Sequence, residues 1–198
     1  MSDLEITTAP LTPDRFDDVA EVFARGLCKQ CWCMYWRLPR KEFQACQGDE
    51  NRRRFEARVA AGPPPGLLAY AGGEPVGWIQ IGPRADVAQW NGARRLSAPL
   101  PDAPVEDPAV WAVSCFTVRG GWRRMGVATA LLDAALDWAR AGGARVIEAC
   151  PVEPEGKRPA ISLYHGIAAP FRRAGFAEVA RRRPDRPLLR LQLGPDLE

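Results

Sequence analysis

The most constraining feature of this sequence is an apolar strand followed by a basic, glycine-containing turn and a long helix. The strand is predicted over residues 111–118, and the helix is predicted over residues 123–141. Gly142 and Gly143 follow the helix, where a C′ glycine commonly ends one. A strand that leads directly into a helix is typical of α/β proteins. Ligands in open α/β sheets bind beyond the carboxyl ends of the strands, so this junction predicts a binding site.

The start of this helix lacks the residues that usually stabilise a helix N-terminus. Acidic residues are favoured there by the helix dipole, and Ser, Thr, Asp or Asn by capping. Here Arg123 and Arg124 come first, and Gly126 weakens the first turn by up to about 1 kcal/mol relative to alanine. An anion bound to the free backbone N–H groups would account for these choices. The alternative is a basic surface helix with a loosely specified start.

The remaining pattern predicts an α/β (α+β) mixed sheet flanked by helices, in a single domain over 1–198. The 83–108 stretch contains five prolines and is expected to be a long loop or insertion that lines or covers a site. Further strands are predicted over 4–8, 67–71, 75–81, 146–150, 176–181 and 188–193, and further helices from Thr12, over 40–60 and over 160–174.

Composition and motifs exclude several classes of protein. The net charge is +3, from 27 basic and 24 acidic residues, which is too small for a typical nucleic-acid-binding protein. No apolar run approaches the roughly 20 residues of a membrane span, and no signal peptide is recognisable. We therefore expect a cytoplasmic protein with reduced thiols and no membrane partner. P-loop and dinucleotide-binding glycine motifs are missing as well.

The turn itself resembles the signature of a known family. Residues 123–128, Arg-Arg-Met-Gly-Val-Ala, are similar to the Gln/Arg-x-x-Gly-x-Gly/Ala motif of the GNAT superfamily of N-acetyltransferases. The strands at 113–118 and 146–150 and the Phe171-x-x-x-Gly175-Phe176 element are also similar, so the resemblance covers 110–181. It implies the GNAT acyl-CoA N-acyltransferase fold, with acetyl-CoA as acyl donor. It further implies direct attack, in a ternary complex, by a primary amine of a small molecule or peptide.

The resemblance also implies how acetyl-CoA is held. Its pyrophosphate would bind backbone N–H groups of residues 125–129, and its pantetheine arm would pair with the backbone of residues 116–118. A backbone N–H of Cys115 or Phe116 would stabilise the oxyanion. The expected cofactor-binding residues are Phe116, Thr117, Val118, Arg123, Arg124, Met125, Gly126, Val127, Ala128 and Thr129.

Three residues are candidates for proton transfer. Glu148 is the carboxylate in the central strands, and burial would suit it to act as general base; alternatively it pairs with an arginine and orders the cleft. The family usually has a tyrosine acid where Phe171 stands. Tyr164, seven residues earlier, is the candidate acid, with a cleft-wall contact as the alternative. His165 is the only histidine and is more typical of a surface residue.

The cysteines form the second unusual feature of the sequence. Three lie within six residues at Cys28, Cys31 and Cys33, and Cys46 follows. Structural zinc sites usually have two separated Cys-x-x-Cys pairs or nearby histidines, so no metal is expected. We predict that the aromatic and thiol-rich segment over 31–36 forms a wall of the acceptor pocket, where rings can hold a cationic amine; core packing is the alternative. The expected substrate-binding residues are Cys31, Trp32, Cys33 and Trp36.

Two other functions remain open from the sequence. One is a non-catalytic acyl-CoA sensor with the same fold, because Phe171 removes the usual acid. The other is a zinc-structured interaction protein built on the cysteines. The sequence does not specify the acceptor amine or the acyl-chain preference. Many members of the family dimerise, so a homodimer is one candidate assembly, although no interface can be recognised.

Overall fold

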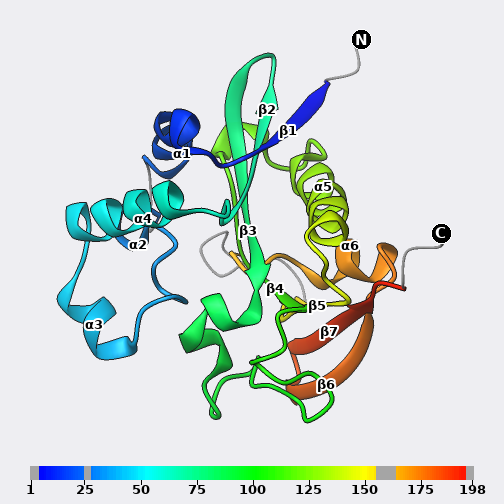
Figure 1. The fold of residues 1–198 in the computed structure, drawn as a ribbon. Coiled ribbons are helices and arrows are strands. Elements are labelled where there is room, and N and C mark those ends of the chain that lie inside the picture. The colour runs from blue at the N-terminus through cyan, green and yellow to red at the C-terminus, as the bar shows by residue number, and fades with distance from the viewer. Residues whose placement is uncertain (1–4, 25–27, 155–163, 195–198) are drawn as a thin grey trace.

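Seven strands form one mixed sheet in the order β1-β2-β3-β4-β5-β7-β6 (Figure 1). The computed structural model describes residues 5–24, 28–154 and 164–194. The mixed α/β sheet predicted from the sequence is confirmed. The strands are β1 Ile6–Pro10, β2 Gly66–Ala71, β3 Glu74–Pro83, β4 Val110–Val118, β5 Val146–Ala149, β6 Ala177–Arg183 and β7 Arg186–Gln192.

The centre of the sheet separates at the carboxyl end of β4. Strands β4 and β5 pair in parallel, whereas the other neighbouring strands are antiparallel. Their pairing ends at Val113 and Ala149, although β4 continues to Val118. On the other side of β4, the register with β3 shifts by one residue at Ser114, which forms a β-bulge. The last part of β4 therefore has a free edge toward β5.

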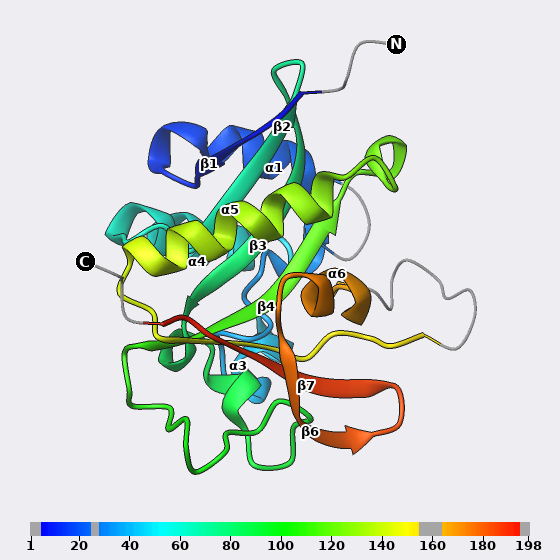
Figure 2. The same cartoon turned by 90° about the vertical axis from the view of Figure 1, so that its right-hand side faces the viewer.

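Helices cover both faces of the sheet (Figure 2). On one face, α5 crosses strands β1 to β4 and α6 lies beside it. The opposite face carries α1 and the cysteine-containing segment. The helices are α1 Phe16–Phe23, α2 Cys28–Cys31, α3 Arg40–Ala45, α4 Asp49–Ala61, α5 Val127–Ala141 and α6 Ala168–Arg173.

The apolar face of α5 fixes this helix against the sheet. Its buried residues follow helical spacing from Val127 to Ala139. Gly77 on β3 allows the close approach, because a Cβ there would lie 2.7 Å from a methyl group of Val127 and 3.1 Å from one of Leu131. Burial of this face, rather than capping, therefore holds the N-terminus of α5 at the end of β4.

The second core packs α1 and α4 against the opposite face. The apolar face of α1 is buried, and it consists of Phe16, Val19, Val22 and Phe23. They pack with Phe55 of α4 and with Trp78 of β3, among others. Thr12 does not cap the first turn through its side chain, and a short 3-10 helix over Pro13–Arg15 precedes α1.

Several predicted boundaries were wrong, and backbone conformation explains two of them. The helix expected over 40–60 is split into α3 and α4, because Gly48 adopts a left-handed φ of 58° at the junction. The helix expected from Arg123 begins at Val127. Of the helical segment expected over 160–174, residues 155–163 lie outside the described residues, and α6 forms the rest.

The 83–108 segment is packed rather than loose. It contains 3-10 helices over Arg84–Asp86 and Ala88–Asn91. Trp90 is 1% exposed, and it packs with Trp36 and Leu188 in a small third core. Among the described residues, no helix is long and apolar enough to cross a membrane.

Candidate active site

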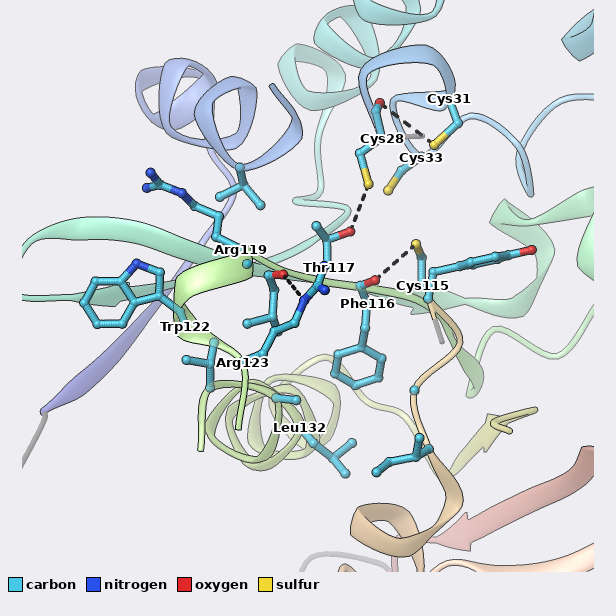
Figure 3. A pocket seen from close by; sticks show the side chains of 18 of the residues that line it. Cys28, Cys31, Cys33, Cys115, Phe116, Thr117, Arg119, Trp122, Arg123 and Leu132 are labelled. Atoms are coloured by element: carbon cyan, nitrogen blue, oxygen red, sulfur yellow. Dashed lines mark hydrogen bonds between the residues drawn. The ribbon is translucent and has the colours of Figure 1, made fainter. Parts of the chain in front are cut away.

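A cavity of about 1400 Å³ opens where β4 separates from β5. Figure 3 shows that side chains from β4, the turn before α5 and the cysteine segment surround it. It is therefore bounded by the helix start and by the cysteine-rich region that the sequence marked as unusual. Its lining includes Glu21, Cys28, Gln30, Cys31, Cys33, Tyr35, Trp36, Phe43, Cys115, Phe116, Thr117, Val118, Arg119, Trp122, Arg123, Arg124, Gly126, Val127, Ala128, Thr129, Leu132, Tyr164 and Phe171.

The N-terminus of α5 presents uncapped backbone N–H groups to this cavity. Gly126 is the N-cap, with a left-handed φ of 84°, and Arg124 before it has a φ of 63°. The helix has no side-chain cap and no acidic residue in its first turn. The first N–H bonded within the helix is that of Ala130, which donates to the carbonyl of Gly126 at 2.9 Å. The amides of residues 127–129 are thus available for an anion.

The free edge of β4 presents a second set of backbone groups. The N–H of Phe116 points to this edge, since it donates to the carbonyl of Tyr164 at 2.6 Å. Backbone groups alternate in direction along a strand, so those of Val118 face the same way. The Val118 carbonyl accepts a hydrogen bond from Arg123 Nε at 3.3 Å. An extended amide-containing ligand could pair with this edge as an added strand.

Four thiols line the side of the cavity that faces the cysteine segment (Figure 3). The sulfur of Cys28 lies 3.2 Å from the hydroxyl of Thr117 on β4. Cys31 is one helical turn further along α2, and its thiol donates to the Cys28 carbonyl at 3.9 Å. Cys33 accepts a hydrogen bond from the indole N–H of Trp78 at 3.1 Å. Cys28, Cys31, Cys33 and Cys115 are all free thiols.

The thiols differ strongly in acidity. The neighbouring side chain of Cys31 lowers the pKa of Cys28 to about 6, against the opposing effect of burial, and the Thr117 hydroxyl lowers it further. The interaction with the Cys28 side chain and burial raise the pKa of Cys31. Burial raises the pKa of Cys33 above its ordinary value. A negative charge in this cluster at neutral pH is therefore carried by Cys28.

Tyr164 lines the cavity, but His165 does not. Burial raises the pKa of Tyr164, so its hydroxyl stays protonated at neutral pH. The His165 ring lies 4.2 Å from the Tyr164 ring and 5.4 Å from Trp36, between centroids. Burial lowers the pKa of His165 to about 3, which keeps this ring neutral. Contrary to the expectation of a surface position, His165 is buried.

The structure does not bring Glu148 to the cavity lining. The side chain is fully buried and forms an ion pair with Arg84, also fully buried. Arg190 Nε and an Arg190 terminal nitrogen lie 3.0 and 2.7 Å from the same carboxylate oxygen. Arg190 in turn binds Asp102 with distances of 2.7 and 3.1 Å. This geometry matches the alternative considered above, in which Glu148 pairs with arginine and orders the cleft.

Most of the other expected site residues meet at the cavity. Of the expected cofactor-binding residues, all except Met125 line it, and Met125 is 45% exposed. Of the expected substrate-binding residues, Cys31, Cys33 and Trp36 line it. Trp32 instead packs in the second core, stacked on Phe16 with ring centroids 6.0 Å apart.

Sequence reasoning missed some lining residues. Cys28 was noticed for its spacing but assigned no role, and Phe43 lay inside a predicted helix without a functional signal. Both line the cavity, together with residues of β4 that are distant in the sequence. Among the described residues, no group of three or more His, Cys, Asp or Glu side chains is arranged to hold a metal ion.

Comparisons with known proteins agree with this geometry. Residues 32–167 match the model of the acetyltransferase (GNAT) family. Among curated proteins, no sequence matches the chain. Many solved structures share its fold, and the three described next are 21% identical to this chain or less.

The GNAT domain of S. lividans PAT is 21% identical, with a TM-score of 0.50 over 94% of this chain and 89% of that one. The yncA structure from Salmonella typhimurium with its cofactor acetyl-CoA is 16% identical, with a TM-score of 0.53 over 98% and 96%. Diaminobutyrate acetyltransferase EctA from Paenibacillus lautus, in complex with L-2,4-diaminobutyric acid and coenzyme A, is 14% identical, with a TM-score of 0.51 over 96% and 95%. The family match covers most of the chain, and we conclude that this protein is a member of the acetyltransferase (GNAT) family and an acyltransferase enzyme.

Proposed function

We propose that this protein transfers an acetyl group from acetyl-CoA to a primary amine of a small molecule or peptide. The observation that carries the proposal is the position on one cavity of two backbone surfaces, the uncapped start of α5 and the part of β4 that does not pair with β5. The uncapped N-terminus of α5 offers N–H groups to a pyrophosphate, and the free edge of β4 offers a partner to an extended arm.

The residues of the cavity fit acetyl-CoA in charge and size. Arg123 and Arg124 flank the α5 amides, and Gly126 has open space around it, since the nearest atom to a Cβ there would be 3.8 Å away. The cavity exceeds the roughly 300–1,000 Å³ of a typical small-molecule site, as a long cofactor together with an acceptor requires. The structures of yncA with acetyl-CoA and EctA with coenzyme A support this donor.

The backbone of β4 would stabilise the transition state. The N–H of Phe116 is a donor at the free edge, now satisfied by the carbonyl of Tyr164. In the complex the acyl oxygen would take the place of that carbonyl, and negative charge would develop on it as the amine attacks. Tyr164, whose hydroxyl stays protonated, would donate to the departing thiolate.

The acceptor would approach from the side of the cysteine segment. The wall there consists of thiols and aromatic rings from Cys31, Cys33, Tyr35, Trp36 and Phe43. Such a wall suits an amine with an apolar or aromatic body, with ring faces available for its cationic form. The expected cytoplasmic location is consistent with acetyl-CoA as donor.

The second candidate function is an acyl-CoA sensor without turnover. Phe171 favours it, because this ring lines the cavity and packs edge-on against Phe116, 5.8 Å away, yet it has no hydroxyl to donate. The ring instead serves as part of the cofactor wall. The two candidates share the binding site and differ only in chemistry.

Turnover with a panel of amines separates the two candidates. Release of free CoA thiol from acetyl-CoA is measured with phenethylamine, spermidine, lysine and a short peptide, with coenzyme A binding measured by calorimetry. The proposed enzyme releases thiol only when an amine is present and forms the acetylated amine, detected by mass spectrometry. Coenzyme A binding with no product from any amine would favour the sensor.

A further inference from the structure

We propose that Cys28 is the group that accepts the proton from the attacking amine, an inference that rests on the acetyltransferase function proposed above. Cys28 lies at the N-terminus of α2, beside the free edge of β4, and its side chain lines the cavity (Figure 3). The sequence marked the cysteine segment as unusual, but the proposed function uses it only as a wall.

The first step of the argument is position. The sulfur of Cys28 lies 3.2 Å from the hydroxyl of Thr117, the residue that follows Phe116 on β4. Phe116 supplies the N–H at the free edge, so Cys28 borders the place where the thioester would lie. Cys28 approaches from the sheet face that carries the acceptor wall, whereas Phe116 and Phe171 pack on the opposite face. A proton acceptor for the amine belongs on the acceptor side.

The second step is charge. The Thr117 hydroxyl lies 3.2 Å from the Cys28 sulfur and can donate to its thiolate, and together with the neighbouring Cys31 side chain it brings the pKa of Cys28 to about 6. A base is most effective when its pKa lies near the working pH, because it is then both ionised and able to take a proton. The titratable and charged groups that share its surroundings are Cys31, Cys33, Cys115, Tyr35, Tyr164, Glu21 and Arg119.

The third step concerns the other groups on the cavity. Among the described lining residues, Glu21 is the carboxylate, and its oxygen pairs with Arg119 at 2.8 Å. Cys31 and Cys33 have raised pKa values, and so does Tyr164, so each of these three stays protonated at neutral pH. Glu148 lies outside the lining, between Arg84 and Arg190. Among the described lining residues, Cys28 is thus the group that both borders the expected place of the thioester and has a lone pair available to accept a proton.

The proton balance closes without another reactant. The Cys28 thiolate takes one proton from the ammonium form of the amine. The neutral nitrogen then forms a bond to the acyl carbon, and the bond from that carbon to sulfur breaks. The departing thiolate gains a proton from the Tyr164 hydroxyl, and the second nitrogen proton passes to the Tyr164 oxygen, so that Tyr164 ends protonated. Cys28 finally releases its proton to solvent, so the reaction yields an amide, free CoA thiol and one proton.

The decisive variants are Cys28→Ala and Cys28→Ser, with Cys46→Ala as control, because Cys46 is a free thiol outside the cavity lining. With the best amine of the panel, we expect kcat at pH 7 to fall about 10²-fold or more in both Cys28 variants. The loss should shrink as the pH rises and the free amine becomes abundant. Coenzyme A affinity should stay within a few-fold of wild type. A purely structural role for Cys28 would not give rescue by high pH.

A second measurement does not depend on activity. The rate of iodoacetamide alkylation of Cys28, followed by peptide mass spectrometry across pH 5 to 10, should show an inflection near pH 6. An inflection near pH 9 in the alkylation rate of Cys28 would overturn the inference. The inference would also fail if Cys28→Ala kept the wild-type kcat and the same decline of kcat at acidic pH. An acetyl adduct on Cys28 that forms and decays at the turnover rate would also overturn it, since Cys28 would then be a nucleophile. Failure of all amines with wild type would instead count against the proposed function, and the alkylation profile would still test Cys28.

Discussion

Glu148 lies between two guanidinium groups, and these neighbours give its carboxylate a structural role in the centre of the sheet. Arg84 and Arg190 both contact it, and Asp102 links the pair to the 83–108 segment. Removing one member of a buried ion pair leaves an uncompensated buried charge. The resulting loss of stability is far larger than the net stability that the pair contributes. The cluster therefore ties β5, β7 and the 83–108 segment together.

We expect Glu148→Gln to lower the free energy of unfolding by about 3–5 kcal/mol, because two buried arginines lose their counter-charge. Urea unfolding at pH 7 measures this loss. The control is Glu178→Gln, whose ion pairs with Arg172 and Arg181 are exposed and should matter little. The kcat/KM per folded molecule should stay within about tenfold of wild type. If kcat/KM per folded molecule fell by more than about 100-fold, the role of general base would belong to Glu148 instead.

His165 should make the protein sensitive to acid. Its pKa is about 3 in the folded protein, against an ordinary value of 6.5, because burial disfavours the charged ring. Between these two values the unfolded chain binds a proton that the folded chain does not bind. Stability is therefore lost as the pH falls from about 6.5 toward 3.

The test is the variant His165→Asn. Its melting temperature should fall less between pH 7 and pH 5 than that of wild type, measured by thermal scans in matched buffers. If the melting temperatures of the variant and the wild type fall equally with pH, another group causes the acid sensitivity.

At the scale of elements, α5 combines a strained start with a well-packed face. Gly126 and Arg124 adopt left-handed conformations before the helix, and no side chain caps it. The apolar residues from Val127 to Ala139 compensate by packing on β1 to β4. This division leaves the first amides of the helix free for a ligand.

Gly126→Glu should abolish the thermal stabilisation that coenzyme A gives, because it places a carboxylate where the pyrophosphate would bind and strains a left-handed position. Gly143→Glu is the matched control. Gly143 has a φ of 81°, near the 84° of Gly126, has open space around it and lies after the other end of α5. Both variants should lose similar intrinsic stability, but only the control should keep the shift in Tm with coenzyme A. An equal shift in both would place the phosphate site elsewhere.

At the scale of the whole molecule, the 83–108 segment packs against β6, β7 and the cysteine segment. Arg84 is fully buried and binds Asn91 at 2.8 Å, and Arg182 of β6 donates to the Leu96 carbonyl at 2.8 Å. Trp90 packs on Trp36 from the cysteine segment. These contacts hold the segment in place, and none of its described residues lines the cavity, whereas the sequence predicted a long loop or insertion that lines or covers a site.

Hydrogen exchange tests this role. Amides around Trp90 should exchange as slowly as those of the sheet core, because their opening requires loss of the third core. Coenzyme A should protect the start of α5 and the end of β4 while leaving the 83–108 segment unchanged. Fast exchange at Trp90 that slows on addition of coenzyme A would identify the segment as a lid.

Local patterns were enough to predict the order of the elements. They also predicted a binding site at the carboxyl end of β4. The strand at 110–118, the helix that follows it and the glycine between them carry signals within about 30 residues. The helix expected from Thr12 and the strands expected over 67–71 and 75–81 were equally readable, and they correspond to α1, β2 and β3. The boundaries at Gly48 and Val127 were missed, because left-handed residues end or delay helices that apolar spacing alone would continue.

By itself, the sequence determined the sheet-and-helix pattern and predicted an anion site at the start of α5, because both depend on neighbouring residues. Only the tertiary structure decided the roles of the ionisable groups. Glu148 lies among arginines that are 64 and 42 positions away in the chain, and Cys28 meets Thr117 across 89 positions. The acidity and reach of a side chain depend on such distant neighbours and on burial, which no local pattern contains.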